Sequence, residues 1–294
     1  MRLVRSTRAM ETWSRALQRE GLVIGLVPTM GALHEGHRAL IRRARLSCDA
    51  VVVSLFVNPR QFGAGEDLAR YPRRLRQDAA LCRDAGADVL FAPSVAAIYP
   101  AGYQTSVSVP SLARRWEGAA RPRHFEGVAT VITKLFSLIR PERAFFGRKD
   151  FQQAAIVRRL AADLNLGVRI VVCPTVREAD GLALSSRNGY LTPEQRRAAP
   201  VLYRALRAGE AAIRGGTTSA ARVRAAMRRI VAGEPLAREE YLAVCDAQTL
   251  EPLRRVRGRV VLLGAVRLGG VRLIDNLLVS GRSAGASAQA GLSR

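Results

Sequence analysis

One segment near the start of the chain combines a strand, a glycine-containing turn and a helix start. The apolar run 22–27 (LVIGLV) is typical of a buried strand, and it leads directly into Pro28–His37 (PTMGALHEGH). A helical pattern follows, with Leu40, Ile41 and Ala44 on one face. Because the first N–H groups of a helix have no partner within the helix, such a corner predicts an anion-binding site.

Two of the three histidines of the chain, His34 and His37, lie in this corner. Imidazoles can donate hydrogen bonds to a phosphate while carrying little fixed charge. The alternative interpretation is a histidine pair that only caps the turn. The strand before the pair and the helix after it favour phosphate binding, because the mechanism of such a motif requires both.

The chain is strongly basic, with 47 lysine and arginine residues, 24 aspartate and glutamate residues and a formal net charge of +23. Such a balance is compatible with a nucleic-acid partner. The arginines, however, are spread over every segment, and few aromatic residues are interleaved with them. A compositional bias and attraction of anionic substrates explain the charge at least as well. We therefore expect no nucleic-acid partner, and a basic protein that binds nucleic acid and keeps only the fold is the alternative.

Length and apolar content are those of an ordinary globular protein. The chain has 294 residues, enough for a full core and two domains, and 48% of them are hydrophobic. No apolar stretch reaches the length of a membrane span, and the N-terminal residues lack the apolar segment of a secretory signal. The four cysteines are too far apart in the sequence for a metal cluster and fit structural thiols in a reducing compartment. We expect a cytoplasmic protein without membrane contact.

The first part of the chain alternates between strand and helix patterns. Repeated alternation of this kind predicts an α/β fold with a doubly wound parallel sheet. After the first strand and helix, strands are expected at 50–57, 88–93, 143–147 and 168–172, and helices at 72–85, at 127–139 and in the segment that carries Ile156, Val157, Leu160 and Leu164.

Beyond about Val176 the pattern changes to helices followed by hairpin-like strands. Thr192, Pro193 and Gln195 form a helix start, as N-cap, N1 and N3 residues. Two Ala/Arg-rich helices separated by 215–216, and strands at 241–245, 260–266 and 271–274, predict a smaller α+β domain. We place a first domain at 1–175, a second at 176–280 and a flexible tail, rich in Gly, Ser and Ala, at 281–294.

Polar clusters follow further strands, where open α/β sheets hold their ligands. Asn58 and Gln61 come after the second strand and offer neutral amides suited to the hydroxyls and carboxylate of a small substrate. Lys149 and Asp150 come after the strand at 143–147 and would meet a polyphosphate and a ribose hydroxyl. The segment 184–188 (LSSRN) adds hydroxyls and an arginine that can clamp phosphates. Each cluster alone also fits a polar turn; together they favour a nucleotide site.

Taken together, the segments resemble the pantoate–β-alanine ligase (pantothenate synthetase) family. The resemblance extends over nearly the whole chain, and it implies the HxGH cytidylyltransferase-like superfamily. It also implies a homodimer with a Rossmann-like N-terminal domain and a C-terminal domain that closes over the site as a lid. The segments that carry it are Pro28–His37, Asn58–Phe62, Phe146–Gln153, Pro174–Gly181 and Ser185–Asn188, with Tyr99–Pro100, His124–Val128 and Asp275–Asn276.

The activity that the resemblance implies is a two-step, AMP-forming condensation. ATP, as co-substrate, and (R)-pantoate give pantoyl adenylate and pyrophosphate with Mg²⁺, and β-alanine then displaces AMP to give pantothenate. A nucleotidyltransferase that adenylates a phosphorylated acceptor and shares the HxGH turn is the second enzyme hypothesis. Its product would be a stable dinucleotide-like compound rather than free AMP.

Site residues follow from the resemblance by motif position. His37 matches the residue assigned as proton donor. Because pyrophosphate leaves readily with Mg²⁺ and cationic help, we favour a hydrogen-bond donor and charge stabiliser instead. His34, His37, Lys149 and Arg187 are placed to stabilise the developing charge. Gln61 matches the residue shared by pantoate and β-alanine, and Gln153 and Asn58 join it as substrate residues. The ATP segments are Met30, Gly31, Ala32, Leu33, His34, Glu35, Gly36 and His37; Gly147, Arg148, Lys149 and Asp150; Val176; and Leu184, Ser185, Ser186 and Arg187.

Three positions depart from the family pattern. Arg60 stands where Met or Thr is usual, Arg148 replaces Glu, and Leu184 replaces Met. None of these changes removes a group expected to contact a substrate, so activity is still expected. For the metal, Asp78 is a weak candidate ligand, since phosphates and water can hold most of the Mg²⁺ coordination sphere.

Overall fold

A computed structural model describes residues 1–280, and the tail predicted at 281–294 lies outside the described residues. The chain forms two compact units. The first consists of Met1–Val176 with Leu184–Ser186, and the second of Arg177–Ala183 with the described chain from Arg187 onward. The short return of 184–186 to the first unit is a feature that the sequence pattern did not indicate.

The first unit is built on one parallel sheet, as predicted for a doubly wound α/β fold. The six strands are arranged in the order β1-β4-β3-β2-β5-β6, and all neighbours are parallel. Near-continuous apolar runs in the central strands agree with burial on both faces. The strands are β1 (Arg2–Val4), β2 (Ile24–Thr29), β3 (Ala50–Leu55), β4 (Val89–Phe91), β5 (Arg143–Gly147) and β6 (Arg169–Cys173).

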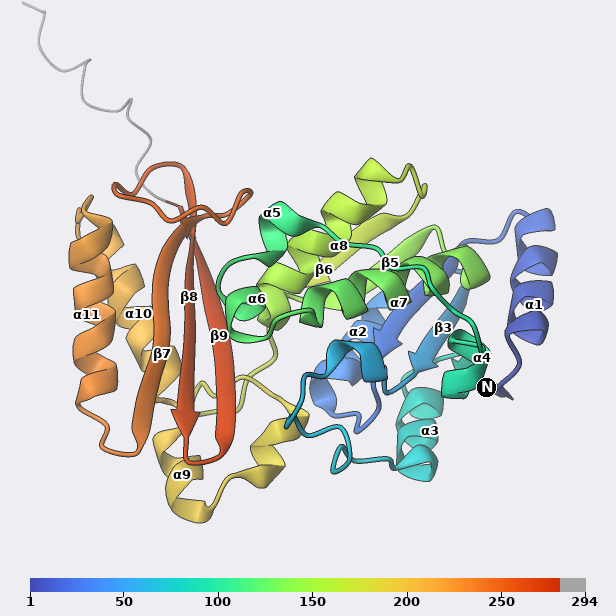
Figure 1. Ribbon diagram of the computed structural model, residues 1–294, viewed down its shortest axis with the longest axis horizontal. Coiled ribbons are helices and arrows are strands. Elements are labelled where there is room, and N and C mark those ends of the chain that lie inside the picture. The colour runs from blue at the N-terminus through green and yellow to red at the C-terminus, as the bar shows by residue number, and fades with distance from the viewer. Residues whose placement is uncertain (281–294) are drawn as a thin grey trace, which may run out of the picture. The chain divides into compact units, whose positions relative to one another are not determined.

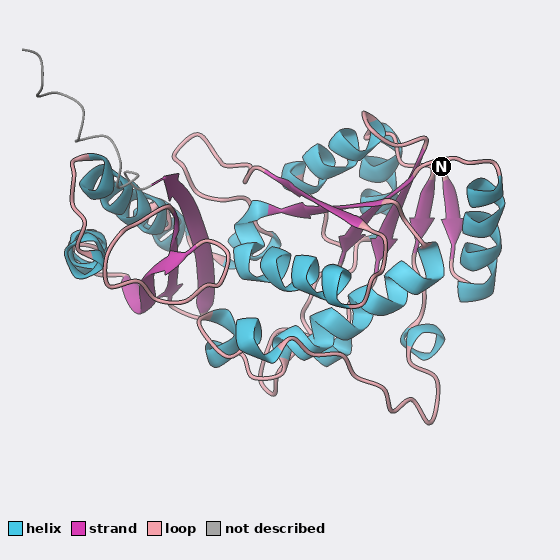
Figure 2. Ribbon diagram, turned by 90° about the horizontal axis from the view of Figure 1, so that it is seen from above, coloured by secondary structure: helices cyan, strands magenta, loops and turns pink. Residues whose placement is uncertain are grey.

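Helices cover both faces of this sheet (Figures 1 and 2). α1 (Thr7–Arg19), α7 (His124–Ile139) and α8 (Phe151–Asp163) share one core with one face. α2 (Glu35–Arg45) and α3 (Leu75–Asp84) share a second core with the other face. β1 and α1 were not predicted from the sequence. The remaining short elements are α4 (Val95–Ile98), α5 (Pro110–Ala113), α6 (Glu117–Ala120), and the 3-10 turns η1 (Pro59–Gln61) and η2 (Arg148–Asp150).

The strand order places a topological switch point between β2 and β5. These two strands are neighbours, yet the chain leaves β2 towards β3 on one side and leaves β5 towards β6 on the other. Open α/β sheets bind ligands at the carboxyl ends of such strands, because the diverging connections leave a crevice there. Pro28–His37 begins at the end of β2, and 147–153 directly follows β5.

The second unit is the smaller α+β fold that the sequence predicted. β7 (Ala237–Asp246), β8 (Arg259–Leu268) and β9 (Val271–Ser280) form an antiparallel sheet. α10 (Val201–Arg214) and α11 (Ala220–Ala232) share an apolar core with it (Figure 1). α9 (Pro193–Ala198) begins at the predicted cap, where Thr192 and Gln195 form a capping box. The 3-10 turn η3 (Ser186–Tyr190) precedes α9.

A buried ion pair fastens the segment Arg177–Ala183 within the second unit. The guanidinium of Arg177 makes two hydrogen bonds with the carboxylate of Asp275 on β9, at 2.5 and 2.9 Å, and donates to the carbonyl of Gly181. It also lies 4.1 Å from the ring centre of Tyr203. Since removing one partner would leave a buried charge uncompensated, this pair commits the segment to the second unit.

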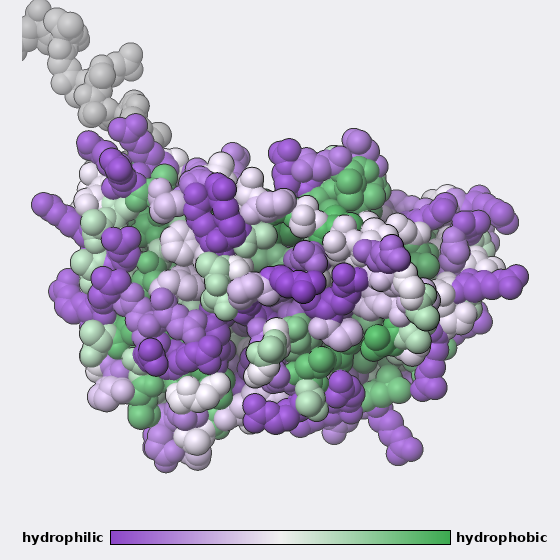
Figure 3. Space-filling model, in the orientation of Figure 1, coloured by the Kyte–Doolittle hydropathy of each residue, from purple (hydrophilic) through white to green (hydrophobic). Residues whose placement is uncertain are grey.

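Within residues 1–280, no helix combines the length and the apolar character that crossing a bilayer needs. The face of the molecule drawn in Figure 3 carries hydrophilic side chains throughout, with smaller apolar areas between them. They do not gather into one stripe on that face.

Candidate active site

His34 caps the N-terminus of α2. Its Nδ1 accepts the backbone N–H of Gly36 at 3.1 Å, and its carbonyl accepts the N–H groups of His37 and Arg38. A Cβ added to Gly36 would lie 2.8 Å from Cε1 of His34, so only glycine lets the imidazole fold back over the helix start. The interpretation of His34 as a cap of the helix start is thus correct.

His37 completes a reciprocal arrangement with His34. Its Nδ1 accepts the backbone N–H of His34 at 3.3 Å, and the two ring centres are 4.2 Å apart. With both Nδ1 atoms accepting, each neutral ring carries its hydrogen on Nε2. The pair therefore caps the helix with one ring nitrogen and keeps the other as a donor.

Both rings are neutral at pH 7. Burial, followed by the charge of Lys149, lowers the pKa of His34 to about 4. Burial, then His34 and Lys149, lowers the pKa of His37 to about 3. The charge of Lys149 reaches both rings, so the structure brings together the segments after β2 and β5, as the sequence predicted.

Most backbone N–H groups of the turn and of the helix start, by contrast, already have acceptors within the protein. The carboxylate of Asp78 accepts the N–H groups of Ala32 and Leu33, at 3.1 and 2.8 Å. Of the first-turn N–H groups of α2, only that of Glu35 has no partner among residues 1–280. Protein acceptors therefore occupy most of the backbone donors at this corner, and phosphate binding here stays a prediction.

Asp78 therefore has a structural role that differs from the one expected of a metal ligand. It is 2% exposed, and it holds a turn in which Gly31 and Ala32 both have positive φ. Burial raises the pKa of Asp78 against the opposing effect of the two N–H groups. Across residues 1–280 no three His, Cys, Asp or Glu side chains come together as a metal site.

The segment 184–186 approaches the same turn. A Cβ on Gly36 would lie 4.0 Å from Cβ of Leu184, and the N–H of Leu184 donates to the carbonyl of Val176 at 3.0 Å. The hydroxyl of Ser186 lies 3.4 Å from that of Tyr71. The structure therefore gathers these predicted ATP segments within the first unit. Ser185 is half-buried beside them in the chain.

The three basic residues of the predicted site, Lys149, Arg148 and Arg187, lie in different environments. Lys149 lies 3.7 Å from the carboxylate of Asp150 and is mostly buried. Arg148 lies near Cys173, because its charge acts on that thiol. Arg187, on η3, is half-buried and belongs to the second unit, so its approach to ATP stays a prediction.

Gln61 is oriented by a chain of amide hydrogen bonds. Nδ2 of Asn58 donates to Oε1 of Gln61 and to the carbonyl of Gly127, both at 3.0 Å, and Oδ1 of Asn58 accepts from the hydroxyl of Tyr99 at 2.9 Å. Oε1 of Gln61 is thereby fixed as the acceptor, and Nε2 faces Sδ of Met30 at 3.0 Å. The Gln61 amide is thus held in one orientation, with one Nε2 hydrogen donated to Met30.

Asn58 itself is 1% exposed, and every hydrogen of its amide is engaged with the protein. The geometry favours a role for Asn58 in orienting Gln61 and not the direct substrate contact that was expected. The alternative of a turn-forming Asn is also correct in part, because its Oδ1 accepts the N–H of Arg60.

The two adjacent glutamines of α8 differ in role. Gln152 is 3% exposed and bonds the backbone of the segment 112–117 through three hydrogen bonds, to Glu117, Leu112 and Arg115. Gln153 is half-buried, and its amide makes no hydrogen bond within residues 1–280. The contact of Gln153 with pantoate stays a prediction.

Arg60, the first departure from the family pattern, lies against aromatic rings. Its guanidinium carbon is 5.5 Å from the ring centre of Tyr99 and 5.2 Å from that of Tyr103. Lys134 approaches the ring of Tyr103 from α7, at 4.7 Å. Cation–π contacts of this kind use the arginine structurally.

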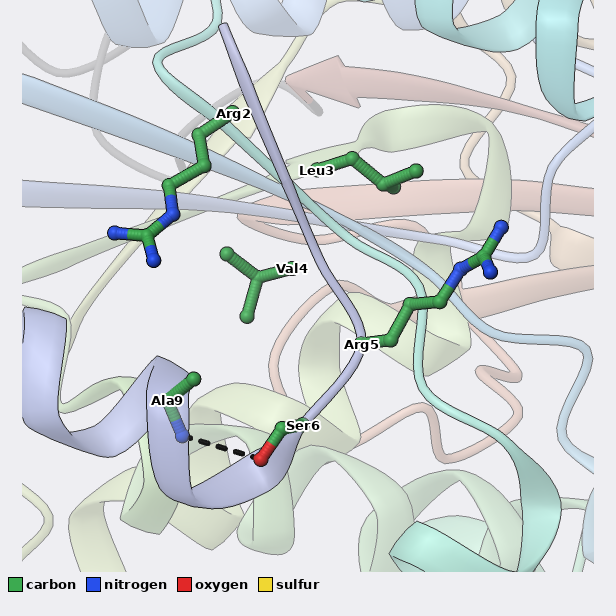
Figure 4. A pocket seen from close by; sticks show the side chains of 6 residues that line it. All are labelled: Arg2, Leu3, Val4, Arg5, Ser6 and Ala9. Carbon is green, nitrogen blue, oxygen red and sulfur yellow. Dashed lines mark hydrogen bonds between the residues drawn. The ribbon is translucent and has the colours of Figure 1, made fainter.

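A separate pocket of about 470 Å³ lies beside β1 and the start of α1 (Figure 4). It is lined by Arg2, Leu3, Val4, Arg5, Ser6 and Ala9, and Ser6 caps α1 by accepting the N–H of Ala9. None of the predicted site residues lines it. We assign it no function.

Comparison with known proteins identifies the family of the chain. The family described as Pantoate-beta-alanine ligase matches residues 2–278. The chain belongs to the pantoate–β-alanine ligase family. Pantothenate synthetase from Heliobacterium modesticaldum is 53% identical over 279 residues, which cover 95% of this chain and 99% of that protein.

Solved structures of the same family share the fold. Pantothenate synthetase from Thermus thermophilus superposes with a TM-score of 0.90 at 50% identity, covering 94% of this chain and 99% of that one. Pantoate-beta-alanine ligase from Francisella tularensis, solved in complex with beta-gamma ATP and beta-alanine, gives a TM-score of 0.78 at 34% identity, with 95% and 97% covered. These matches confirm the α/β fold with its smaller C-terminal unit.

Proposed function

We propose that this chain is an ATP-dependent ligase that joins (R)-pantoate to β-alanine and forms pantothenate. Membership of the family supports the activity, and the relative from Francisella tularensis binds beta-gamma ATP and beta-alanine. The observation that carries the assignment in this chain is the neutral pair His34 and His37, with Nε2–H donors and Lys149 beside them, at the switch point of the sheet.

In the first proposed step, a carboxylate oxygen of pantoate attacks the α-phosphorus of ATP. The bond between the α-phosphorus and the oxygen that bridges it to the β-phosphorus breaks, and pantoyl adenylate and pyrophosphate form. Negative charge grows on the leaving pyrophosphate, so the Nε2–H groups of His34 and His37 and the ammonium of Lys149 would stabilise it. Because burial keeps both rings neutral, with pKa values of about 4 for His34 and about 3 for His37, we assign both histidines as hydrogen-bond donors rather than acids.

In the second proposed step, the amine of β-alanine attacks the acyl carbon of the adenylate and AMP leaves. Gln61 and Gln153 would hold pantoate through neutral amides, which position its carboxylate without neutralising the nucleophile. Holding two substrates in sequence supplies much of the rate, since no covalent intermediate with the protein is needed.

The remaining assignments complete the proposal. Mg²⁺ stays a prediction from the resemblance, and no step is assigned to it. A homodimer is proposed on the same ground. A cytoplasmic location agrees with four cysteines that are all buried and unpaired.

The decisive experiment is the exchange of labelled pyrophosphate into ATP. Exchange that requires pantoate but not β-alanine, together with release of free AMP once β-alanine is added, is the expected result. A stable dinucleotide-like product would instead indicate the transferase hypothesis. Salt-dependent binding of duplex or RNA by folded protein without exchange would indicate the nucleic-acid hypothesis.

A further inference from the structure

The third histidine, His124, has no part in the activity described so far. It is the first residue of α7 and is 9% exposed. Its Nδ1 lies 2.8 Å from the backbone carbonyl oxygen of Gln61, and its Nε2 lies 3.1 Å from Nη1 of Arg121. Both ring nitrogens are thus engaged, one of them with the backbone of the residue that we assign to pantoate.

The partners of His124 define its tautomer. A guanidinium can only donate, so Nε2 of His124 must accept from Arg121. The ring hydrogen then lies on Nδ1 and is donated to the carbonyl of Gln61. Burial, followed by the charge of Arg121, lowers the pKa of His124 to about 4, so the ring stays in this neutral form at pH 7.

Arg121 is itself held rigidly by Glu66. Its Nε and Nη2 donate to the two carboxylate oxygens of Glu66, at 2.8 and 2.6 Å, and Nη2 also donates to the carbonyl of Gln61 at 3.2 Å. Although burial alone would raise the pKa of Glu66, the hydrogen bonds and charge of Arg121 outweigh it and keep that pKa below its usual value. The carbonyl of Gln61 therefore receives two donors, which saturate both of its lone pairs.

A close backbone contact completes the support of Gln61. Gly127 on α7 packs so tightly against η1 that an added Cβ would lie 2.3 Å from the carbonyl oxygen of Arg60 and 2.6 Å from the N of Gln61. Asn58 fixes the side-chain amide of Gln61, and the His124 contact fixes its main chain. Two independent sets of hydrogen bonds thus converge on one glutamine.

We propose that His124 is a positioning residue: its Nδ1–H, with Arg121 and Glu66 behind it, fixes the main chain of Gln61 so that the Gln61 amide meets pantoate. The inference rests on the proposed function, because it requires Gln61 to bind pantoate. Misplacing a binding group by about 1 Å costs up to about a hundredfold in rate. The loss of this contact should therefore cause a measurable change in the kinetics.

Two substitutions of similar polarity separate the contacts of His124. In His124→Asn, the side-chain amide reaches the place of Nδ1 and can still donate to the Gln61 carbonyl. In His124→Gln, the amide reaches the place of Nε2 and can meet Arg121 but not Gln61. We expect His124→Asn to keep the KM for pantoate within about threefold, and His124→Gln to raise it at least about tenfold while the KM for ATP stays within about twofold.

Thr130→Val is the matched control. Thr130 lies on the same helix, is 1% exposed, and accepts the backbone N–H of Val107 at 3.0 Å. The substitution removes a buried side-chain to backbone hydrogen bond without touching Gln61. We expect it to lower the melting temperature and leave both KM values unchanged.

Pyrophosphate exchange measured for all variants distinguishes a failure of this inference from a failure of the proposed function. If His124→Gln behaves like Thr130→Val, with both KM values kept, the inference is overturned while the proposed function stands. If the unaltered chain catalyses no exchange, the proposed function fails, and the role given to His124 fails with it.

A readout independent of activity tests the tautomer. In side-chain ¹⁵N NMR spectra at pH 7 we expect His124 to carry its proton on Nδ1, and His34 and His37 to carry theirs on Nε2. A proton on Nε2 of His124 would contradict the hydrogen bond to Gln61 and overturn the inference.

Discussion

His34 and His37 cap the same helix start reciprocally: Nδ1 of His37 accepts the backbone N–H of His34, and Nδ1 of His34 accepts the N–H that follows at Gly36. Each imidazole thereby serves two purposes at once. One nitrogen satisfies a backbone donor of α2, and the other keeps a hydrogen for a ligand. Serine or aspartate at the N-cap would satisfy the helix but offer no second donor.

The substitution His34→Asn should separate these two purposes. Asparagine is a good N-cap residue and can still accept the N–H of Gly36, but it lacks the Nε2–H donor. We expect the free energy of unfolding to change by less than about 1 kcal/mol, and the rate of pyrophosphate exchange to fall about 10²-fold. Urea unfolding and exchange kinetics check the two expectations. An unchanged rate would remove His34 from the phosphate site.

Acid should destabilise the protein through all three histidines. The pKa values of His34, His37 and His124 are about 4, 3 and 4, below the ordinary 6.5. The unfolded chain therefore binds more protons than the folded one between these values and 6.5, so stability is complete above about pH 6.5 and falls as the pH is lowered. We expect the melting temperature to decrease steadily from about pH 6.5 to about pH 5.

The number of protons that the chain takes up on unfolding can be measured directly. Calorimetry at about pH 5 in buffers of different ionisation enthalpy gives the protons taken up on unfolding. His124→Asn should reduce that number by about one relative to the unaltered chain, because one histidine that is neutral only when folded has been removed. An equal uptake in both proteins would show that His124 is already charged in the folded state.

The substitution Asp78→Asn tests whether this carboxylate holds the turn or a metal. An amide has only one acceptor oxygen, so it cannot keep the present arrangement, in which the N–H groups of Ala32 and Leu33 donate to different carboxylate oxygens. We expect about 1–3 kcal/mol of lost stability and a raised KM for ATP. The Mg²⁺ concentration that gives half-maximal exchange should stay the same. A large increase in that concentration would instead identify Asp78 as a magnesium ligand.

The substitution Gly127→Ala tests the close packing of α7 on η1. The added methyl would overlap the carbonyl of Arg60, so the backbone of Gln61 must move. We expect a loss of about 1–3 kcal/mol of stability and a larger rise in the KM for pantoate than in the KM for ATP. Gly270→Ala is the control, because a Cβ there meets nothing within 4 Å. Equal effects of the two substitutions would contradict the tight contact.

Local patterns in the sequence predicted much of the fold. The apolar runs and helical periods located most strands and helices of both units, and the Thr192 cap was identified correctly. β1 was missed because a strand of three residues carries little periodic signal, and α1, a helix of 13 residues, was not predicted either. β2 ends at Thr29, two residues beyond the predicted run, because pairing with β3 continues that far.

The sequence indicated candidate site residues but not the contacts that each of them makes in the fold. Adjacent Gln152 and Gln153 look alike in the sequence, yet one is buried against the 112–117 backbone and the other is half-buried. The motif His124–Val128 is indicated only by the resemblance, and nothing local shows that His124 bonds a residue 63 positions earlier.

The sequence by itself determined which segments become strands and helices, which polar residues follow the strands, and which family the motifs resemble, because these properties depend on neighbours along the chain. Only the tertiary structure decided that Asp78 occupies the backbone donors of the turn, that Asn58 orients Gln61, and that His124 adopts the tautomer opposite to that of the other two histidines. Hydrogen bonds between residues distant in the sequence depend on where the sheet places them, and no local pattern encodes that placement.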